Sequence, residues 1–376
     1  MDGWSFHNPV RIRFGTGSRE ALQSRLAERR VLIVSTSRGR RQFEEDALLS
    51  AAIASAASVS WVDDVIQNPG LLQTQRAIEG LSGIHIDVVL AFGGGSAMDV
   101  AKALAAALAH PDMERDLGSL IAHPAQYLTS AVPVIALPTT AGTGSEVTPF
   151  ATIWDHQARK KLSLASAHLF PEMAIVDPSL TFDLPGESTF STGLDALNQA
   201  FEAVWNRNSS PITRGFAGHA IGLALEGLPR LHRSLGDQEA REMLAQASLL
   251  AGLSISHTRT AICHAMSYPL TAHFGLAHGW ACAVTMGAVA REVFEKRREV
   301  FEAIAPLAGF AAGIDLLDGL ETVLETLSVR EVAGKSIGNV DAVMALIPQM
   351  VIPGRSDNFI LPVDEARLAQ IVSASL

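Results

Sequence analysis

Cysteine is scarce in this sequence of 376 residues, which contains only Cys263 and Cys282. Two cysteines exclude a disulfide scaffold and a thiolate-rich zinc knuckle, and they suit a reducing, cytoplasmic location. No uninterrupted apolar run reaches the ~20 residues of a membrane span, and the first residues lack the basic and apolar regions of a signal peptide. We therefore expect a cytoplasmic protein that does not associate with a membrane.

The chain also lacks an excess of basic residues. It has 29 Lys and Arg against 39 Asp and Glu, a net charge of −10, which argues against a nucleic-acid surface. Nearly half of the residues, 48%, are hydrophobic, and the mean hydropathy is +0.22. The length and composition predict two domains with large cores, at roughly 150 residues for each domain.

The first half of the chain alternates between short apolar runs and helical patterns. This alternation predicts a doubly wound, mostly parallel sheet, and one of the intervening helices is expected over 43–55. The predicted strands are 10–14, 31–34, 59–62, 88–92, 134–137 and 174–176.

The pattern changes after Leu184-Pro185-Gly186, where strand-like runs stop and long helical patterns begin. We place a domain boundary at this point. Residues 1–185 are predicted to form an α/β dinucleotide-binding domain, and residues 186–376 an all-helical domain that holds the metal and the substrate.

Two loops that follow predicted strands carry the features of a nucleotide site. Glycines let a backbone approach an anion, and a helix N-terminus offers free N–H groups. The alternatives are a plain tight turn for the first loop and a solvated loop for the second. The candidate cofactor contacts are Gly93, Gly94, Gly95, Ser96 and Asp99 in and after the first loop, and Thr139, Thr140, Thr143 and Ser145 in the second.

Histidines are concentrated between His264 and His278, with His273 between them. Pro269 and Gly275 indicate a helix end, a loop and a new helix start, and such a bend can direct His264 and His278 toward one point. Asp195, among apolar residues, shares a helix face with Gln199 four residues later. An Asp/His/His set with an open position is typical of catalytic metal sites, whereas ordinary ion pairs or core histidines are the alternative.

Taken together and in this order, these motifs resemble the iron-containing alcohol dehydrogenase family. The resemblance covers nearly the whole chain and implies an α/β nucleotide domain, a helical domain, a metal in the cleft between them, and homodimers or larger oligomers. It adds Asn68 and Lys161 to the cofactor contacts. The implied metal ligands are Asp195, Gln199, His264 and His278.

The sequence departs from the family pattern at two places. Gln199 stands where the family has a second ligand histidine, and an amide oxygen is a poorer ligand for Fe²⁺ or Zn²⁺, so zinc is as good a candidate as iron. Tyr268 stands where the family has a histidine near the nicotinamide; it either donates a proton to the substrate or packs. His273 is either a proton relay or a residue at the rim of the site.

Two further positions bear on specificity. Arg259 stands where many relatives have Gly, and its guanidinium offers a fork of donors for a carboxylate, phosphonate or sulfonate. The alternative is a surface ion pair. The sequence around Arg259 resembles the phosphonoacetaldehyde reductase branch of the family. After the second predicted strand, Thr36 and Arg38 occupy the place where NAD enzymes carry an acidic residue. NADP(H) is therefore favoured, with NAD(H) as the alternative.

The sequence thus predicts hydride transfer between a nicotinamide and a small, anionic aldehyde polarised by a divalent metal. Candidate catalytic residues are Tyr268, His273 and Arg259. The alternatives are a maleylacetate reductase, a generic short-chain alcohol dehydrogenase, a lyase similar to dehydroquinate synthase, and a nucleotide-binding protein without turnover.

Overall fold

The computed structural model describes residues 3–110 and 116–376, which form two compact units. One unit comprises Asn8–Thr140 and Ser145–Thr181. The other comprises Phe182–Leu376, residues 3–7, and the short segment Ala141–Gly144.

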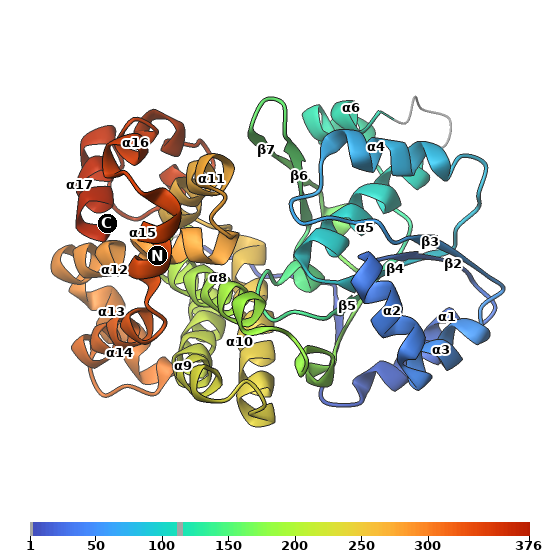
Figure 1. Cartoon of the computed structure of the whole chain (residues 1–376), viewed down its shortest axis with the longest axis horizontal. Coiled ribbons are helices and arrows are strands. Elements are labelled where there is room, and N and C mark those ends of the chain that lie inside the picture. Colours follow the sequence, from blue (N-terminus) through green and yellow to red (C-terminus); the bar gives the residue numbers. More distant parts are fainter. Residues whose placement is uncertain (1–2, 111–115) are drawn as a thin grey trace. The chain divides into compact units, whose positions relative to one another are not determined.

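The first unit is built on a parallel sheet of six strands with the order β1-β8-β5-β4-β2-β3. Figure 1 labels β5, β4, β2 and β3 of this sheet. Each predicted strand is present, so the doubly wound arrangement is confirmed. The strands are β1 (Arg11–Phe14), β2 (Arg30–Val34), β3 (Ser58–Val62), β4 (Val88–Gly93), β5 (Val134–Pro138) and β8 (Met173–Val176).

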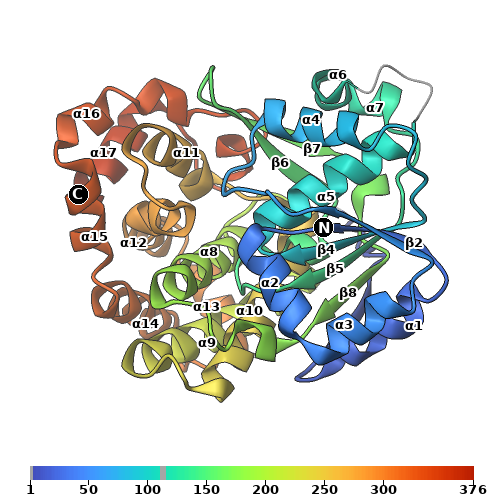
Figure 2. The ribbon, with the colours of Figure 1, turned by 45° about the vertical axis from the view of Figure 1, so that its right-hand side comes forward.

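Both faces of the sheet are covered because successive side chains of a strand point to opposite sides. In β2, Val31 and Ile33 pack with α1 (Leu22–Leu26), α2 (Ser37–Glu45) and α3 (Ala47–Ala54). Leu32 and Val34 pack on the other face with α4 (Leu71–Gly80) and α5 (Gly95–Leu108). Figure 2 shows α4 and α5 on the opposite side of the sheet from α1 and α3. Strands buried on both faces read as continuous apolar runs, which explains why the sequence indicated them clearly.

Two local expectations about this unit need correction. The helix expected over 43–55 is two helices, because Asp46 ends α2 and its carboxylate accepts the N–H groups of Leu48 and Leu49 to begin α3. The sequence also gave no indication of the antiparallel hairpin β6 (Phe150–Asp155) and β7 (Lys160–Ala165). Lys161 lies on this hairpin opposite Trp154. The unit also contains α6 (Leu117–Ala122) and α7 (Pro124–Tyr127).

The second unit is helical in its described residues, apart from one isolated bridge between Asn206 and Phe359. Its central helix, α8, packs against α9, α10 and α12. The helices are α8 (Gly186–Val204), α9 (Pro211–Arg233), α10 (Gln238–Thr258), α11 (Ile262–Phe274), α12 (His278–Lys296), α13 (Arg298–Ile304), α14 (Gly313–Thr326), α15 (Val329–Ile337), α16 (Val340–Met344) and α17 (Glu365–Ser375).

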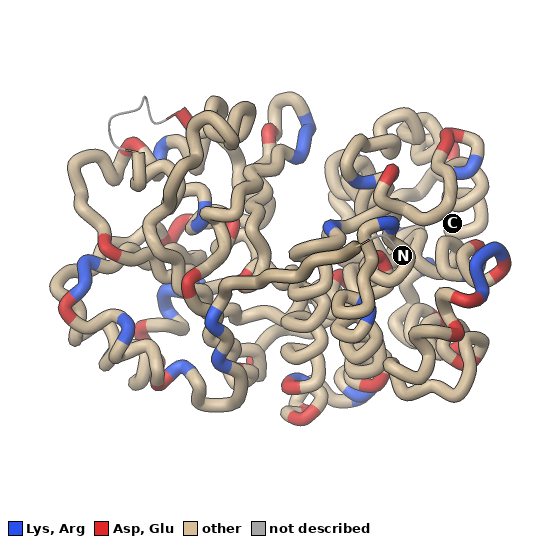
Figure 3. Tube along the Cα trace, turned by 180° about the vertical axis from the view of Figure 1, so that it is seen from behind, with Lys and Arg blue, Asp and Glu red and all other residues tan. Residues whose placement is uncertain are grey.

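Acidic and basic residues are interspersed along the trace (Figure 3). Within the described residues, no single helix is long and apolar enough to cross a membrane. The pair Arg298–Ala308 and Gly313–Thr326 meets the length and composition criteria only when joined, and it is bent by 76°.

Candidate active site

The two outer histidines of the cluster are brought together by a helix–loop–helix turn. Helix α11 ends at Gly275, which adopts the left-handed conformation with φ 67°, and α12 begins at His278. The centres of the His264 and His278 rings consequently lie 5.2 Å apart. The predicted bend is confirmed, except that Pro269 lies inside α11 rather than at its end.

Helix α8 brings Asp195 to the same place. Its Oδ1 lies 3.2 Å from Nε2 of His264 and 3.9 Å from Nε2 of His278. The close approach of α12 to α8 depends on Gly279, since a Cβ at that position would collide with the carbonyl oxygen of Ser191. Three of the four predicted ligands therefore meet in space, and Asp195 and His264 are each only 3% exposed.

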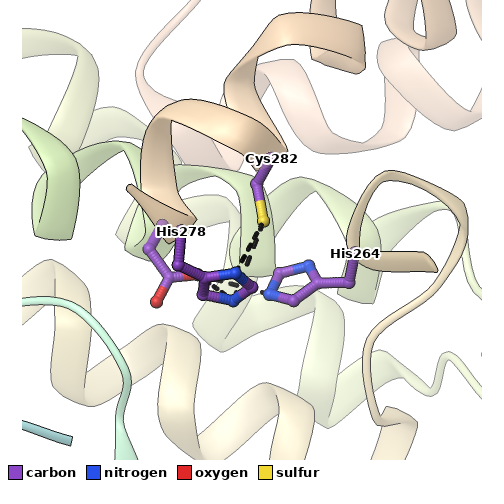
Figure 4. Close-up of side chains that lie close together, drawn as sticks. His264, His278 and Cys282 are labelled. Atoms are coloured by element: carbon purple, nitrogen blue, oxygen red, sulfur yellow. Dashed lines mark hydrogen bonds and ion pairs between the residues drawn. The ribbon is translucent and has the colours of Figure 1, made fainter. Parts of the chain in front are cut away.

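Cys282 is a fourth member of this cluster that the sequence analysis did not single out. Its thiol lies one helical turn beyond His278, with Sγ 3.9 Å from Nε2 of that histidine (Figure 4). Ligand atoms of Asp195, His264, His278 and Cys282 all lie within 4.8 Å of one another. The i, i+4 spacing of His278 and Cys282 on a single helix was the signal that could have identified it.

The separations fit a metal ion. Ligands at 2.0–2.3 Å from a tetrahedral zinc lie roughly 3.3–3.8 Å from each other. The Asp195–His264, Asp195–His278 and His278–Cys282 separations are 3.2, 3.9 and 3.9 Å. These three separations differ from the zinc range by about 0.1 Å, and every other pair of ligand atoms in the cluster lies within 4.8 Å.

Gln199 adds a second observation in favour of a cation. It lies one turn along α8 from Asp195 and is 3% exposed. Its amide oxygen Oε1 has no hydrogen-bond partner among the described residues. A buried amide oxygen without a partner costs free energy, and a nearby cation would remove that cost.

Glu202 holds His264 in place, and the sequence analysis missed it. Its Oε2 lies 2.8 Å from Nδ1 of His264 and also accepts the N–H of Ala261 at 2.7 Å, while Oε1 accepts the N–H of Cys263 at 2.6 Å. A carboxylate on Nδ1 holds a proton on that nitrogen, so Nε2 is the ring nitrogen that a metal would bind in place of a proton. Asp195, Gln199 and Glu202 have i, i+4, i+7 spacing on α8, which is a recognisable one-face pattern.

The electrostatics of the cluster favour a positive charge at its centre. Burial by itself would lower the pKa of His264, but Cys282, Glu202 and Asp195 beside the ring outweigh burial and hold that pKa well above its usual value. Two buried carboxylates around one imidazole need a compensating cation. A divalent metal would supply that charge.

The two candidate proton donors are placed differently. The half-buried Tyr268 stacks on His278 with ring centres 6.2 Å apart, so it lies beside the metal cluster. His273 is exposed, and its Nε2 lies 3.3 Å from Oε1 of Gln349. The arrangement favours Tyr268 as the residue that reaches substrate and places His273 outside the cluster.

The two nucleotide loops follow neighbouring strands. Gly93 at the end of β4 pairs with Pro138 at the end of β5, and Thr139 N–H donates to the carbonyl of Gly93 at 3.0 Å. Gly93 has φ 151°, a conformation that favours glycine. A Cβ on Gly94 would lie 3.1 Å from the Thr140 hydroxyl oxygen. Helix α5 starts at Gly95 without a side-chain cap, so its N-terminus is suited to an anion such as pyrophosphate.

Asp99 and Lys102 hold the second loop in place. The Asp99 carboxylate accepts the Ser145 hydroxyl at 2.9 Å and the Thr152 N–H at 3.0 Å. Lys102 is completely buried and donates to the Ser145, Thr148 and Phe150 carbonyls. Burial lowers the pKa of this lysine to about 8. The contacts that Asp99 makes are with Ser145 and Thr152 of the protein itself. Thr143, another predicted cofactor residue, belongs to the helical unit.

Two of the remaining predicted cofactor residues lie at the start of α2, and the third, Asn68, lies in the bend before α4. The Thr36 hydroxyl accepts the N–H of Gly39 and caps α2, and Arg38 is exposed in the first turn of that helix. Asn68 has φ 55°, and its carbonyl lies 3.0 Å from Nε2 of His156.

Comparison with known proteins gives consistent matches. Residues 9–178 match the family described as iron-containing alcohol dehydrogenase, and residues 189–330 match the C-terminal part of the Fe-containing alcohol dehydrogenase family. An NADPH-dependent butanol dehydrogenase of Clostridium saccharobutylicum is 30% identical over 328 residues, covering 86% of this chain and 84% of that protein.

A phosphonoacetaldehyde reductase of Streptomyces viridochromogenes is 46% identical over 216 residues, covering 56% of this chain. The alignment spans only 54% of that relative's length. Among solved structures, a sulfoacetaldehyde reductase of Bifidobacterium kashiwanohense in complex with NAD⁺ has a TM-score of 0.89 at 29% identity, with 100% of this chain and 99% of that chain covered.

Proposed function

Because the chain belongs to the iron-containing alcohol dehydrogenase family, we propose that it is a metal-dependent, NAD(P)H-linked aldehyde reductase. The observation that carries this proposal is the buried Asp195, His264 and His278 cluster, whose separations fit one divalent cation. Fe²⁺ and Zn²⁺ are the candidate metals, with Gln199 or Cys282 available for a further contact.

A divalent cation in this cluster would polarise the substrate carbonyl, and a bound nicotinamide would supply the hydride to the carbonyl carbon. The chain itself provides positioning. Glu202 fixes the tautomer of His264 through Nδ1, and the Tyr268 hydroxyl is our candidate for holding the proton that the substrate oxygen takes up.

For the cofactor, we propose NADP(H) before NAD(H). In support, the first turn of α2 after β2 presents the exposed Arg38, and no acidic residue occurs between Ser35 and Arg41. The name of the butanol dehydrogenase relative includes NADPH, whereas the sulfoacetaldehyde reductase structure contains NAD⁺. The Gly93–Ser96 loop, with Asp99, Asn68, Thr139, Thr140, Thr143, Ser145 and Lys161, would form the nucleotide site.

For the substrate, we propose a small aldehyde that carries an anionic group, of the phosphonoacetaldehyde type. Two relatives with phosphono- and sulfoacetaldehyde in their names support this class, as does the exposed Arg259. A neutral short-chain aldehyde is the second candidate, favoured by the butanol dehydrogenase that aligns along most of the chain. A homodimer acting in the cytoplasm completes the proposal.

The test is oxidation of NADPH and NADH by the purified protein, followed by absorbance, with phosphono-, sulfo-, carboxy- and neutral aldehydes. Each assay is run with Fe²⁺, Zn²⁺ or a chelator. We expect turnover of an anionic aldehyde that chelation abolishes. Turnover of all aldehydes regardless of charge would support a generic alcohol dehydrogenase. Product without a change in nicotinamide absorbance, or binding without turnover, would contradict the proposal.

A further inference from the structure

Arg259 has a backbone conformation that side chains rarely adopt. It follows the last residue of α10 with φ 59° and ψ −179°, a region occupied almost only by glycine. Strained positions of this kind persist where the surroundings enforce them, and they cluster at functional sites. An arginine at such a position points to a function for its side chain, since glycine would fit the backbone without strain.

The surroundings enforce this conformation through hydrogen bonds. The Arg259 carbonyl accepts the Thr258 hydroxyl at 2.9 Å and the Asn206 amide at 3.3 Å, and the Thr260 carbonyl accepts the Asn358 amide at 2.9 Å. The fixed backbone therefore holds the start of the Arg259 side chain in one direction.

The same segment is joined to the metal cluster. Two residues after Arg259, the N–H of Ala261 donates to Glu202, and the same carboxylate oxygen of Glu202 lies 2.8 Å from Nδ1 of His264. Two residues of extended chain span at most about 7 Å. The Arg259 backbone thus lies within a short distance of the carboxylate that orients the metal-binding ring.

A second guanidinium lies beside this segment. Arg355 donates from Nη1 to the hydroxyl of Thr260 at 3.0 Å. Neither Arg259 nor Arg355 has a carboxylate within 4.0 Å in the described part of the chain, although acidic residues outnumber basic ones in this protein. Partial burial of its guanidinium first, and the Arg355 charge second, lower the pKa of Arg259. Two neighbouring cations without a counter-charge make a site for an anion.

We propose that Arg259 and Arg355, on either side of Thr260, bind the anionic head group of the aldehyde and favour a doubly charged phosphonate over a singly charged sulfonate or carboxylate. The identity of the ligand as an aldehyde substrate rests on the proposed reductase function. The presence of an anion-binding site at these two arginines does not depend on that function. Arg355 is then a specificity-determining residue.

The test uses four variants of the full chain. Arg259→Gly and Arg259→Ala both remove the guanidinium, but only glycine relieves the backbone strain. Arg355→Met removes the second charge while keeping the length of the side chain. Arg233→Met, at an exposed position on α9, is the matched control for loss of one positive charge. If the backbone at 259 is strained, Arg259→Gly melts roughly 2–6 °C above Arg259→Ala.

Binding is measured by calorimetry with 2-hydroxyethylphosphonate, 2-hydroxyethylsulfonate and 1-propanol as probes. We expect the phosphonate to bind more tightly than the sulfonate. Each of Arg259→Gly and Arg355→Met should weaken phosphonate binding by roughly 10- to 100-fold, with Arg233→Met close to the unaltered protein. Equal weakening for 1-propanol, or no weakening in Arg355→Met, would overturn the inference.

Turnover gives the second readout. The ratio of kcat/KM for phosphonoacetaldehyde to that for propanal should fall in both arginine variants, mainly through KM, and Arg355→Lys should restore part of it. An unchanged ratio would refute the specificity role. Absence of turnover with any aldehyde, together with intact phosphonate binding that needs both arginines, would overturn the reductase function while leaving the anion site supported.

Discussion

Replacing Glu202 with Gln exchanges one carboxylate oxygen for an NH₂ group at the centre of the site. The present carboxylate faces four donors: the N–H groups of Ala261, Cys263 and His264, and Nδ1 of the His264 ring. Because α11 begins without a side-chain cap of its own, Glu202 caps this helix from α8.

The amide has two orientations, and each loses acceptors. In the first orientation, the amide oxygen faces the N–H groups of Cys263 and His264, and the NH₂ group faces the N–H of Ala261 and the ring Nδ1 of His264. The ring can adapt only by moving its proton to Nε2, which is the nitrogen that faces Asp195 and the metal. The flipped orientation leaves two backbone N–H groups facing NH₂ and is worse.

The expected cost follows from these contacts. One buried N–H without an acceptor destabilises the fold by about 1–3 kcal/mol, and the wrong tautomer lowers metal affinity by roughly 10- to 100-fold. Glu202→Ala leaves three backbone N–H groups without an acceptor and should destabilise the protein by more than Glu202→Gln. Metal affinity is measured by elemental analysis after dialysis against buffered Zn²⁺, and stability by urea unfolding of the metal-free protein.

Glu242→Gln, at an exposed position on α10, is the control for loss of one negative charge. Metal affinity and urea midpoint of Glu202→Gln equal to those of this control would refute the role of Glu202 in orienting His264.

Three other predictions address the same molecule. Asp195→Asn should remove bound metal and turnover together, and full activity of the metal-free variant would refute the ligand assignment. The cobalt-substituted protein should show sulfur-to-cobalt absorption that Cys282→Ser eliminates; absence of the band from the unaltered protein would exclude Cys282 from the ligand set. Burial raises the pKa of Glu146 from 4.5 to about 6, so the folded state binds the proton more tightly than the unfolded state does. The free energy of unfolding should therefore fall by about 2 kcal/mol from well below pH 4.5 to well above pH 6, with about 1 kcal/mol of this fall between pH 4.5 and 6; this slope should disappear in Glu146→Gln.

Several features of the fold could be predicted because they depend on local patterns. The apolar runs of β2, β4 and β5 indicate strands buried on both faces, and Gly275 indicates the end of α11. The β6–β7 hairpin and the break at Asp46 escaped prediction, since their signals are short and compete with longer periodic patterns around them. The predicted contacts of Thr36, Asn68 and the other nucleotide residues stay predictions.

The candidate site shows the same division between local pattern and tertiary structure. The sequence by itself determined the residue types for metal chemistry, the bend between His264 and His278, and the shared helix face of Asp195 and Gln199, because helix periodicity and glycine conformation are local properties. Only the tertiary structure decided that Cys282 joins the cluster, that Glu202 holds His264, and that Arg355 stands beside Arg259. These contacts join residues 62 to 95 positions apart or on different helices, so they depend on how the helices pack, which periodicity does not specify.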